Sequence, residues 1–103
     1  MNEHQAAGAI SAETIQSGLT GILKEMTADW DLFYSGDIGA DTKLIEELGF
    51  ESIDIVQLVV AIQEHFKRRD FPFEELLMAD GRYVDEITVR DTVSFLHGHL
   101  NSH

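Results

Sequence analysis

Apolar residues recur at every third or fourth position in three stretches of the chain, which is the spacing of amphipathic helices with one buried stripe. The first stretch begins after Ser11, a residue type that suits a helix N-cap. Its stripe is Ile15, Leu19, Ile22, Leu23, Met26 and Trp30. Residues 1–10 show no such period, so we expect a flexible N-terminal tail before this helix.

A second helix is predicted over residues 52 to about 69, and it carries two apolar stripes. The wider stripe, which we expect to face the core, is Ile55, Leu58, Val59, Ile62 and Phe66. The narrower stripe, which begins beside Ser52, is Ile53, Val56 and Val60. Two interpretations of it stay open. It is either the wide buried face of a small bundle, or an exposed ridge for partner docking that is rimmed by Glu51 and Asp54.

Two shorter elements and a last helix follow. Pro72 suits the first position of a short third helix that ends at Met78, with the inward-facing residues Phe73, Leu76 and Leu77. The Asp-Gly pair at residues 80–81 predicts a turn. Thr88 is expected to cap the last helix together with Asp91. The buried stripe of this helix is Val89, Val93, Leu96 and Leu100.

Between the first two helices, from Asp29 to Phe50, the apolar period is lost. Loops longer than about 12–15 residues are uncommon unless they are functional or pinned to the core. The expected apolar pins are Ile38, Leu44, Ile45 and Leu48. We also expect a short helical turn that runs through Glu47 and is capped by Asp41 or Thr42.

These elements predict an all-α bundle of three to four helices with a long first loop. One domain is expected over residues 11–100, followed by a C-terminal tail at residues 101–103. A chain of 103 residues with 44% hydrophobic content supports a modest core but no deep, enclosed active site. No paired carboxylates or Ser-His-Asp arrangement calls for a catalytic explanation, so we do not expect an enzyme.

The charge is strongly acidic, with 19 Asp and Glu against 7 Lys and Arg and a net charge of -12. Such a chain repels nucleic-acid phosphates and anionic lipid surfaces and favours basic protein partners, although solubility alone is an equally good explanation. Eight of the acids lie between Asp29 and Asp54, opposed there only by Lys43. The negative field is therefore expected to concentrate around Ser52.

Other composition features exclude several kinds of site. The absence of cysteine excludes disulfides and thiolate metal ligands. The acids Asp29, Asp31 and Asp37 do not form a calcium loop, because Tyr34 stands where that loop requires glycine. His97, His99 and His103 do not share a helix face, so no metal site is expected. No apolar run approaches 18 residues, and we expect a cytoplasmic monomer without membrane insertion.

Ser52 stands where a glycine-containing turn leads into the second helix. Its local role is that of an N-cap, whose hydroxyl accepts a hydrogen bond from the first helical turn. A second role, compatible with the first, is that of an exposed hydroxyl presented for covalent modification.

The segment Gly-Phe-Glu-Ser-Ile-Asp at residues 49–54, followed by the apolar helix, resembles the acyl and peptidyl carrier protein family. The resemblance implies that a phosphopantetheinyl transferase attaches 4′-phosphopantetheine from coenzyme A to Ser52. It further implies that the thiol of this arm holds acyl groups as thioesters for fatty-acid, lipid or polyketide-type synthesis. In the family the second helix is the recognition helix, and the implied pocket for the acyl chain is lined by Ile55, Val59 and Leu77.

Three departures from the family pattern indicate a specialised, discrete carrier rather than the central fatty-acid one. Residues 71–86 form a longer segment than in the housekeeping carriers, and Gln57, Gln63 and His65 stand where those carriers usually have acids. The first loop also carries an unusual aromatic cluster, Trp30, Phe33 and Tyr34. Such a carrier would work with a dedicated acyl-activating enzyme or a synthase that has a basic docking surface. Two alternatives stay open: a peptidyl or aminoacyl carrier, and an unmodified acidic helical adaptor in which Ser52 is only a cap.

Overall fold

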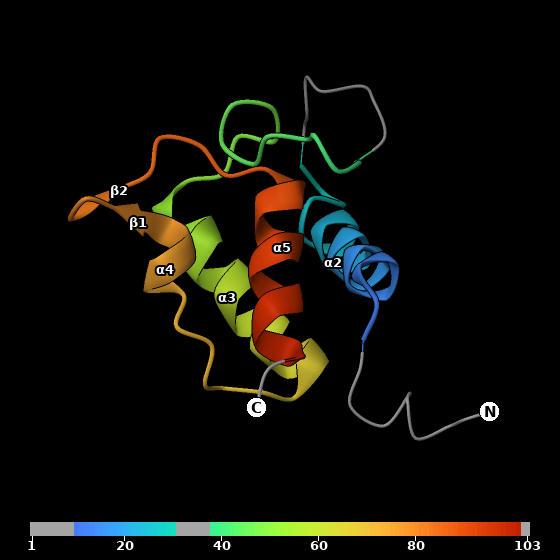
Figure 1. Cartoon of the computed structure of the whole chain (residues 1–103). Coiled ribbons are helices and arrows are strands. Elements are labelled where there is room, and N and C mark those ends of the chain that lie inside the picture. Colours follow the sequence, from blue (N-terminus) through green and yellow to red (C-terminus); the bar gives the residue numbers. More distant parts are fainter. Residues whose placement is uncertain (1–9, 31–37, 102–103) are drawn as a thin grey trace.

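The computed structural model of the chain describes residues 10–30 and 38–101. Within them the elements are α2 (Ala12–Met26), α3 (Ser52–Phe66), α4 (Glu74–Leu77), β1 (Met78–Ala79), β2 (Arg82–Tyr83) and α5 (Val89–Leu100). Helix α2 packs against both α3 and α5, and the small β1–β2 hairpin lies at the edge of the molecule remote from α2 (Figure 1). The predicted helical bundle of the carrier-protein type is confirmed, with the hairpin as an unpredicted addition.

The first helix follows the sequence pattern as far as Met26, where α2 ends, so Trp30 of the predicted stripe lies beyond the helix. Ser11 is its N-cap, and the Ser11 hydroxyl accepts a hydrogen bond from the backbone N–H of Thr14 at 3.1 Å. The fully buried part of its stripe is Ile15, Leu19 and Leu23. A Cβ atom on Gly18 would come within 2.7 Å of His65 Nε2, so the missing side chain makes room for the His65 ring of α3.

The long first loop is pinned by apolar side chains and by backbone pairing. Leu44 and Leu48 are buried, as predicted, and Ile38 and Ile45 are half-buried. In addition, the N–H of Leu44 donates to the carbonyl of Ile87 at 2.9 Å, and the N–H of Val89 donates to the carbonyl of Thr42 at 3.0 Å. These hydrogen bonds attach the loop to the start of α5.

The expected helical turn through Glu47 is present, because the N–H of Glu47 donates to the carbonyl of Lys43 at 3.0 Å, but it does not extend into a helix. Residues 44–48 form consecutive turns and not a helix. Asp41 pairs with Arg90 instead of capping these turns, and the N–H of Lys43 donates to Glu47 Oε1 at 2.7 Å. Residues 31–37, which include three of the residues considered for a calcium loop, lie outside the described part of the chain.

Two helix boundaries differ from the prediction. Helix α3 ends at Phe66, three residues early, because Lys67 adopts the left-handed conformation with φ +58°. Helix α4 begins at Glu74 rather than Pro72, with the buried Phe73 as its N-cap residue, and ends as Met78 becomes extended. Helix α5 begins as predicted, since Thr88 Oγ1 accepts from the N–H of Asp91 at 3.0 Å.

The hairpin forms at the predicted Asp-Gly turn. Asp80 and Gly81 have φ values of +55° and +79°, and two consecutive positive φ angles characterise the type I′ turn that matches the twist of paired strands. Met78 pairs with Tyr83, and Ala79 pairs with Arg82. Strands of two residues are too short to show an alternating pattern, so the sequence indicated only the turn.

The two ends of the described core meet. The N–H of Ile10 donates to Asn101 Oδ1 at 2.8 Å, and Asn101 Nδ2 donates to the Ile10 carbonyl at 3.0 Å. The prediction placed these two residues in the terminal tails, whose other residues lie outside the described ranges. Among the described helices none is long and apolar enough to cross a membrane.

Candidate functional site

Ser52 is the first residue of α3 and is exposed. The expectation that it caps this helix is wrong, because the N-cap residue is Glu51, which has extended backbone angles. The N–H of Glu51 donates to Asp54 Oδ2 at 2.8 Å, so the carboxylate of Asp54 closes the helix start. The Ser52 hydroxyl makes no hydrogen bond within the described part of the chain.

The segment before Ser52 is fixed by a turn and an aromatic anchor. Gly49 has φ +76°, a conformation that costs glycine little and other residues more. Phe50 is buried, its N–H donates to the Leu44 carbonyl at 3.0 Å, and its ring centroid lies 5.3 Å from that of Trp30. The serine is therefore presented at a defined position on the surface.

The narrower apolar stripe of α3 is exposed. The exposed fractions are 58% for Ile53, 57% for Val56 and 46% for Val60. The interpretation of this stripe as part of a wide buried face is therefore wrong. Glu51 is exposed and Asp54 is half-exposed beside it, so apolar and acidic groups share one surface at Ser52. A docking role for these five residues stays a prediction.

A groove of roughly 540 Å³ opens beside Ser52, between the start of α3, the first loop and the hairpin. Most of its lining is apolar, with two polar residues at the end nearest the helix start. The lining residues are Ile45, Phe50, Glu51, Ser52, Ile55, Val56, Leu77, Tyr83, Val84 and Ile87. Two of the three predicted pocket residues, Ile55 and Leu77, belong to this lining, whereas Val59 does not. We call this space the Tyr83 groove.

A second space lies deeper, between α3 and α4. Ile55, Val59 and Leu77 all line it, so the structure brings the three predicted pocket residues together. Its volume is only about 10 Å³, however. A cavity needs roughly 10–15 Å³ to hold a single water molecule, so this part of the core is filled by its own side chains.

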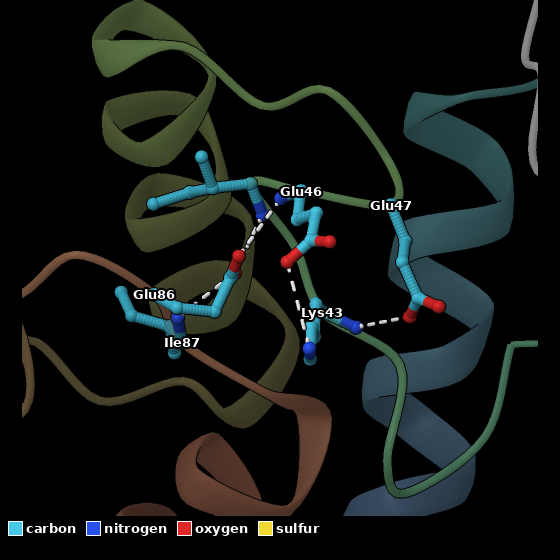
Figure 2. A network of polar contacts seen from close by, with 6 residues as sticks. Lys43, Glu46, Glu47, Glu86 and Ile87 are labelled. Carbon is cyan, nitrogen blue, oxygen red and sulfur yellow. Dashed lines mark hydrogen bonds and ion pairs between the residues drawn. The ribbon is translucent and has the colours of Figure 1, made fainter.

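One carboxylate holds two walls of the Tyr83 groove together. Glu86 Oε2 accepts from the N–H groups of Ile45 at 2.8 Å and Ile87 at 3.0 Å, and Glu86 Oε1 accepts from the N–H of Glu46 at 2.8 Å (Figure 2). We call this set of three hydrogen bonds the Glu86 clamp. Sequence reasoning missed it, since Glu86 lies 41 residues from Ile45 and no local pattern marks it.

The histidines near the C-terminus do not gather around a metal. Within residues 10–30 and 38–101 no group of three or more His, Cys, Asp or Glu side chains is placed to hold an ion. His99 instead pairs with α4, where its Nε2 lies 3.1 Å from Glu75 Oε1. His103 lies outside the described residues.

The part of the chain that contains Ser52 is similar to known proteins. Residues 22–81 match the family model described as "Phosphopantetheine attachment site". A segment of 58 residues is 33% identical to the acyl carrier protein of Campylobacter fetus subsp. fetus (strain 82-40), and the match covers 56% of this chain and 65% of that protein. The chain thus spans just under two thirds of the relative's length.

The geometry at Ser52 fits a phosphopantetheine group. Attachment to a hydroxyl creates a phosphodiester anion, and the first turn of the 15-residue helix α3 offers backbone N–H groups and the positive end of the helix dipole. Ser52 is exposed, which leaves access for a modifying enzyme. The Tyr83 groove begins at the same residue and gives a flexible, partly apolar arm a surface to lie on.

Proposed function

This chain belongs to the phosphopantetheine-attachment-site family of carrier proteins, and we propose that it is an acyl carrier protein whose arm is attached to Ser52. One observation carries the choice of residue. Within the matched range Ser52 stands at the first position of a helix, exposed and without a hydrogen bond to the rest of the described chain. A serine that only capped the helix would have its oxygen engaged.

The cofactor is a covalently attached 4′-phosphopantetheine, which supplies a terminal thiol that holds acyl groups as thioesters. The chain has no cysteine of its own for this purpose. The protein's part is to present the Ser52 oxygen, which displaces adenosine 3′,5′-bisphosphate from coenzyme A on the transferase. Helix α3 then stabilises the phosphodiester at its N-terminal end.

Partners of this carrier are a phosphopantetheinyl transferase and acyl-handling enzymes of fatty-acid, lipid or polyketide-type synthesis. The exposed stripe of α3 suits a transient apolar contact, and the net charge of -12 suits a basic docking surface on the partner. The stripe and the exposed, acidic Glu51 both adjoin Ser52, where every partner must reach the arm.

The experiment that tests this function is a mass measurement. After incubation with coenzyme A and a promiscuous phosphopantetheinyl transferase, we expect the wild-type chain to gain the mass of one phosphopantetheine group. A chain that stays unmodified with several transferases would contradict the proposal. The exposed stripe would then favour the unmodified adaptor instead.

The docking surface yields a separate prediction. We expect Val56→Asp to slow arm transfer at both low and high salt, because it removes an apolar contact. Glu51→Lys should also slow it, but less at high salt, because charge attraction is screened over about 8–10 Å at ordinary ionic strength. Initial rates of arm transfer at two salt concentrations measure both effects. Asp54→Lys does not isolate the effect of charge, because Asp54 also accepts a hydrogen bond from the Glu51 N–H and its loss disturbs the start of α3.

The matched control for Val56→Asp is Gln57→Asp, which adds the same charge at the neighbouring exposed position without removing an apolar side chain. We expect Gln57→Asp to transfer at nearly the wild-type rate. Equal rates for the wild type and Val56→Asp would show that the exposed stripe does not contact the transferase.

A further inference from the structure

A second surface groove, of roughly 550 Å³, lies between α4, the segment that follows the hairpin, and α5. Among the described residues that line it, none belongs to α2 or α3, and it shares only Val84 and Ile87 with the Tyr83 groove. Helices α4 and α2 lie on opposite sides of α5, and the groove follows the α4 side (Figure 1). We call this space the Gly98 groove. It is separate from Ser52 and from the exposed stripe of α3.

Gly98 lines this groove without an internal reason to lack a side chain. It lies inside α5 and is exposed, although glycine is among the poorest helix formers. Its backbone does not have the positive φ that would require glycine, and a Cβ atom there would meet nothing within 4 Å. At Gly18, by contrast, the ring of His65 uses the room. The space at Gly98 is therefore open to an atom from outside the chain.

Apolar side chains contribute much of the lining. Leu76, Val84 and Phe95 are all half-buried, so each keeps part of its apolar surface in contact with water. Aromatic neighbours hold the Phe95 ring in place, since its centroid lies 5.4 Å from that of Phe73 and 4.8 Å from that of His99. A fixed, partly exposed ring suits contact with an aliphatic side chain or with a cation.

The charge around the groove is negative. The lining contains no lysine or arginine and three acids, Glu75, Glu86 and Asp91. His99, the other ionisable side chain of the lining, lies with its Nε2 3.1 Å from Glu75 Oε1. Arg90 is the residue before Asp91, but it is engaged by the first loop, where its Nη2 lies 2.8 Å from Asp41 Oδ1. A basic group from outside would therefore complement this surface.

These features limit the kind of occupant. A second copy of this chain also carries a net charge of -12 and is repelled, as are nucleic acids and anionic lipids. A purely apolar ligand would leave the acids without a partner. A protein segment with adjacent basic and apolar side chains matches both the charge and the apolar lining.

We propose that the Gly98 groove binds a segment of a partner protein in which an arginine or lysine stands next to an aliphatic side chain. The aliphatic side chain fills the space at Gly98 beside the Phe95 ring, and the basic side chain pairs with the exposed Glu75 or Asp91. Since the groove leaves Ser52 and the α3 stripe uncovered, a partner bound here holds the carrier while another enzyme reaches the arm. The binding itself needs no arm, so it goes beyond the proposed function and is tested apart from it.

The test is an NMR titration of the full, unmodified, isotope-labelled chain. The probe is a synthetic peptide of alternating leucine and arginine with blocked ends. Saturable shifts are expected at the amides of Val84, Phe95 and Gly98. The same peptide with serine in place of leucine should bind roughly 10-fold or more weakly, because the apolar contact is lost. The peptide with glutamate in place of arginine should not bind.

Gly98→Leu fills the groove from within the chain. Its side chain enters open space and leucine is the better helix former, so the melting temperature should not fall. The affinity for the leucine-arginine peptide should drop by roughly 10-fold or more. Gly21→Leu is the matched control, because Gly21 is also exposed inside a helix with open space around it, but its neighbours are polar. This variant should bind the peptide with wild-type affinity.

A charge reversal tests the acidic part of the groove. Glu75→Lys should weaken peptide binding by roughly 3- to 10-fold at low salt, and less at high salt. Glu74→Lys is the matched control, because it makes the same change of charge at the neighbouring exposed position of α4 without lining the groove. Its effect should stay below about 2-fold. Equal effects of the two reversals would show that the peptide responds only to net charge, which overturns the inference.

Several other results also overturn it. A titration without saturable shifts, or with shifts confined to Ile53, Val56 and Val60, shows that the groove does not take the peptide. Wild-type affinity in Gly98→Leu has the same meaning. A wild-type chain that sediments as a dimer, with Gly98→Leu as a monomer, makes a second copy the occupant. A chain that binds the peptide as expected but never gains the phosphopantetheine mass contradicts the proposed function alone.

Discussion

Ser52→Ala is expected to abolish attachment of the arm while leaving the melting temperature nearly unchanged or slightly higher. The substitution removes the only oxygen that the proposed chemistry uses. It removes no cap, because Glu51 and Asp54 close the start of α3, and alanine is the better helix former by about 0.5 kcal/mol. Intact-protein mass after incubation with coenzyme A and transferase, together with a thermal melt followed by circular dichroism, measures both effects.

The control for this experiment is the other serine in the matched range. Residues 22–81 contain two serines, Ser35 and Ser52. Ser35→Ala should gain the full phosphopantetheine mass. If Ser52→Ala were still labelled and Ser35→Ala were not, the attachment site would be Ser35, and the carrier function would stand on a different residue.

A second variant separates chemistry from helix stability. Asp54→Ala removes the acceptor for the Glu51 N–H and should lower the free energy of unfolding by about 1 kcal/mol, the usual cost of a lost cap. A comparable loss in Ser52→Ala would mean that the serine does help to start α3.

The sequence predicted best what is decided locally. Ser11 and Thr88 were identified as caps because a capping side chain bonds a backbone group only two or three residues away. Helical stripes were equally visible, because a spacing of three and four residues is all that defines a buried face.

The first residue of α3 was predicted correctly, but its N-cap was placed one residue late, at Ser52 instead of Glu51, for an identifiable reason. Serine is a preferred N-cap and glutamate is not, so residue preference pointed to Ser52. The actual start depends on the turn at Gly49 and the burial of Phe50 against Trp30, which leave Glu51 extended. Asp54 then lies three residues from the N-cap, as a capping pair requires.

The Tyr83 groove lay beyond the reach of local patterns. Its walls come from the first loop, α3, α4 and the hairpin, and only the fold brings Ile45 next to Ile87. The predicted pocket residues Ile55, Val59 and Leu77 do converge, but no sequence pattern tells whether side chains fill the space between them. Packing density is a property of the assembled core.

Loss of the Glu86 clamp should be among the most destabilising single changes at a half-exposed position of this chain. Glu86→Ala removes the acceptor of three backbone N–H groups, and hydrogen bonds to a charged group contribute about 1.5–3 kcal/mol each. Water replaces part of this hydrogen bonding at a half-buried site, so we expect the free energy of unfolding to fall by about 2–3 kcal/mol in total. For a domain of this size that corresponds to a drop in melting temperature of roughly 8–20 °C.

A control variant and the sites of faster hydrogen exchange distinguish loss of the Glu86 clamp from a general effect of removing an acidic side chain. Glu47→Ala is the matched control, because Glu47 accepts one hydrogen bond, from the Lys43 N–H, within the same turns. It should cost no more than about 1.5 kcal/mol. In Glu86→Ala, but not in Glu47→Ala, amide hydrogen exchange at Ile45 and Ile87 should accelerate more than at the centre of α2, since the clamp fixes those two groups directly. A Glu86→Ala chain as stable as the wild type would mean that the contacts along the start of α5 hold the first loop without it.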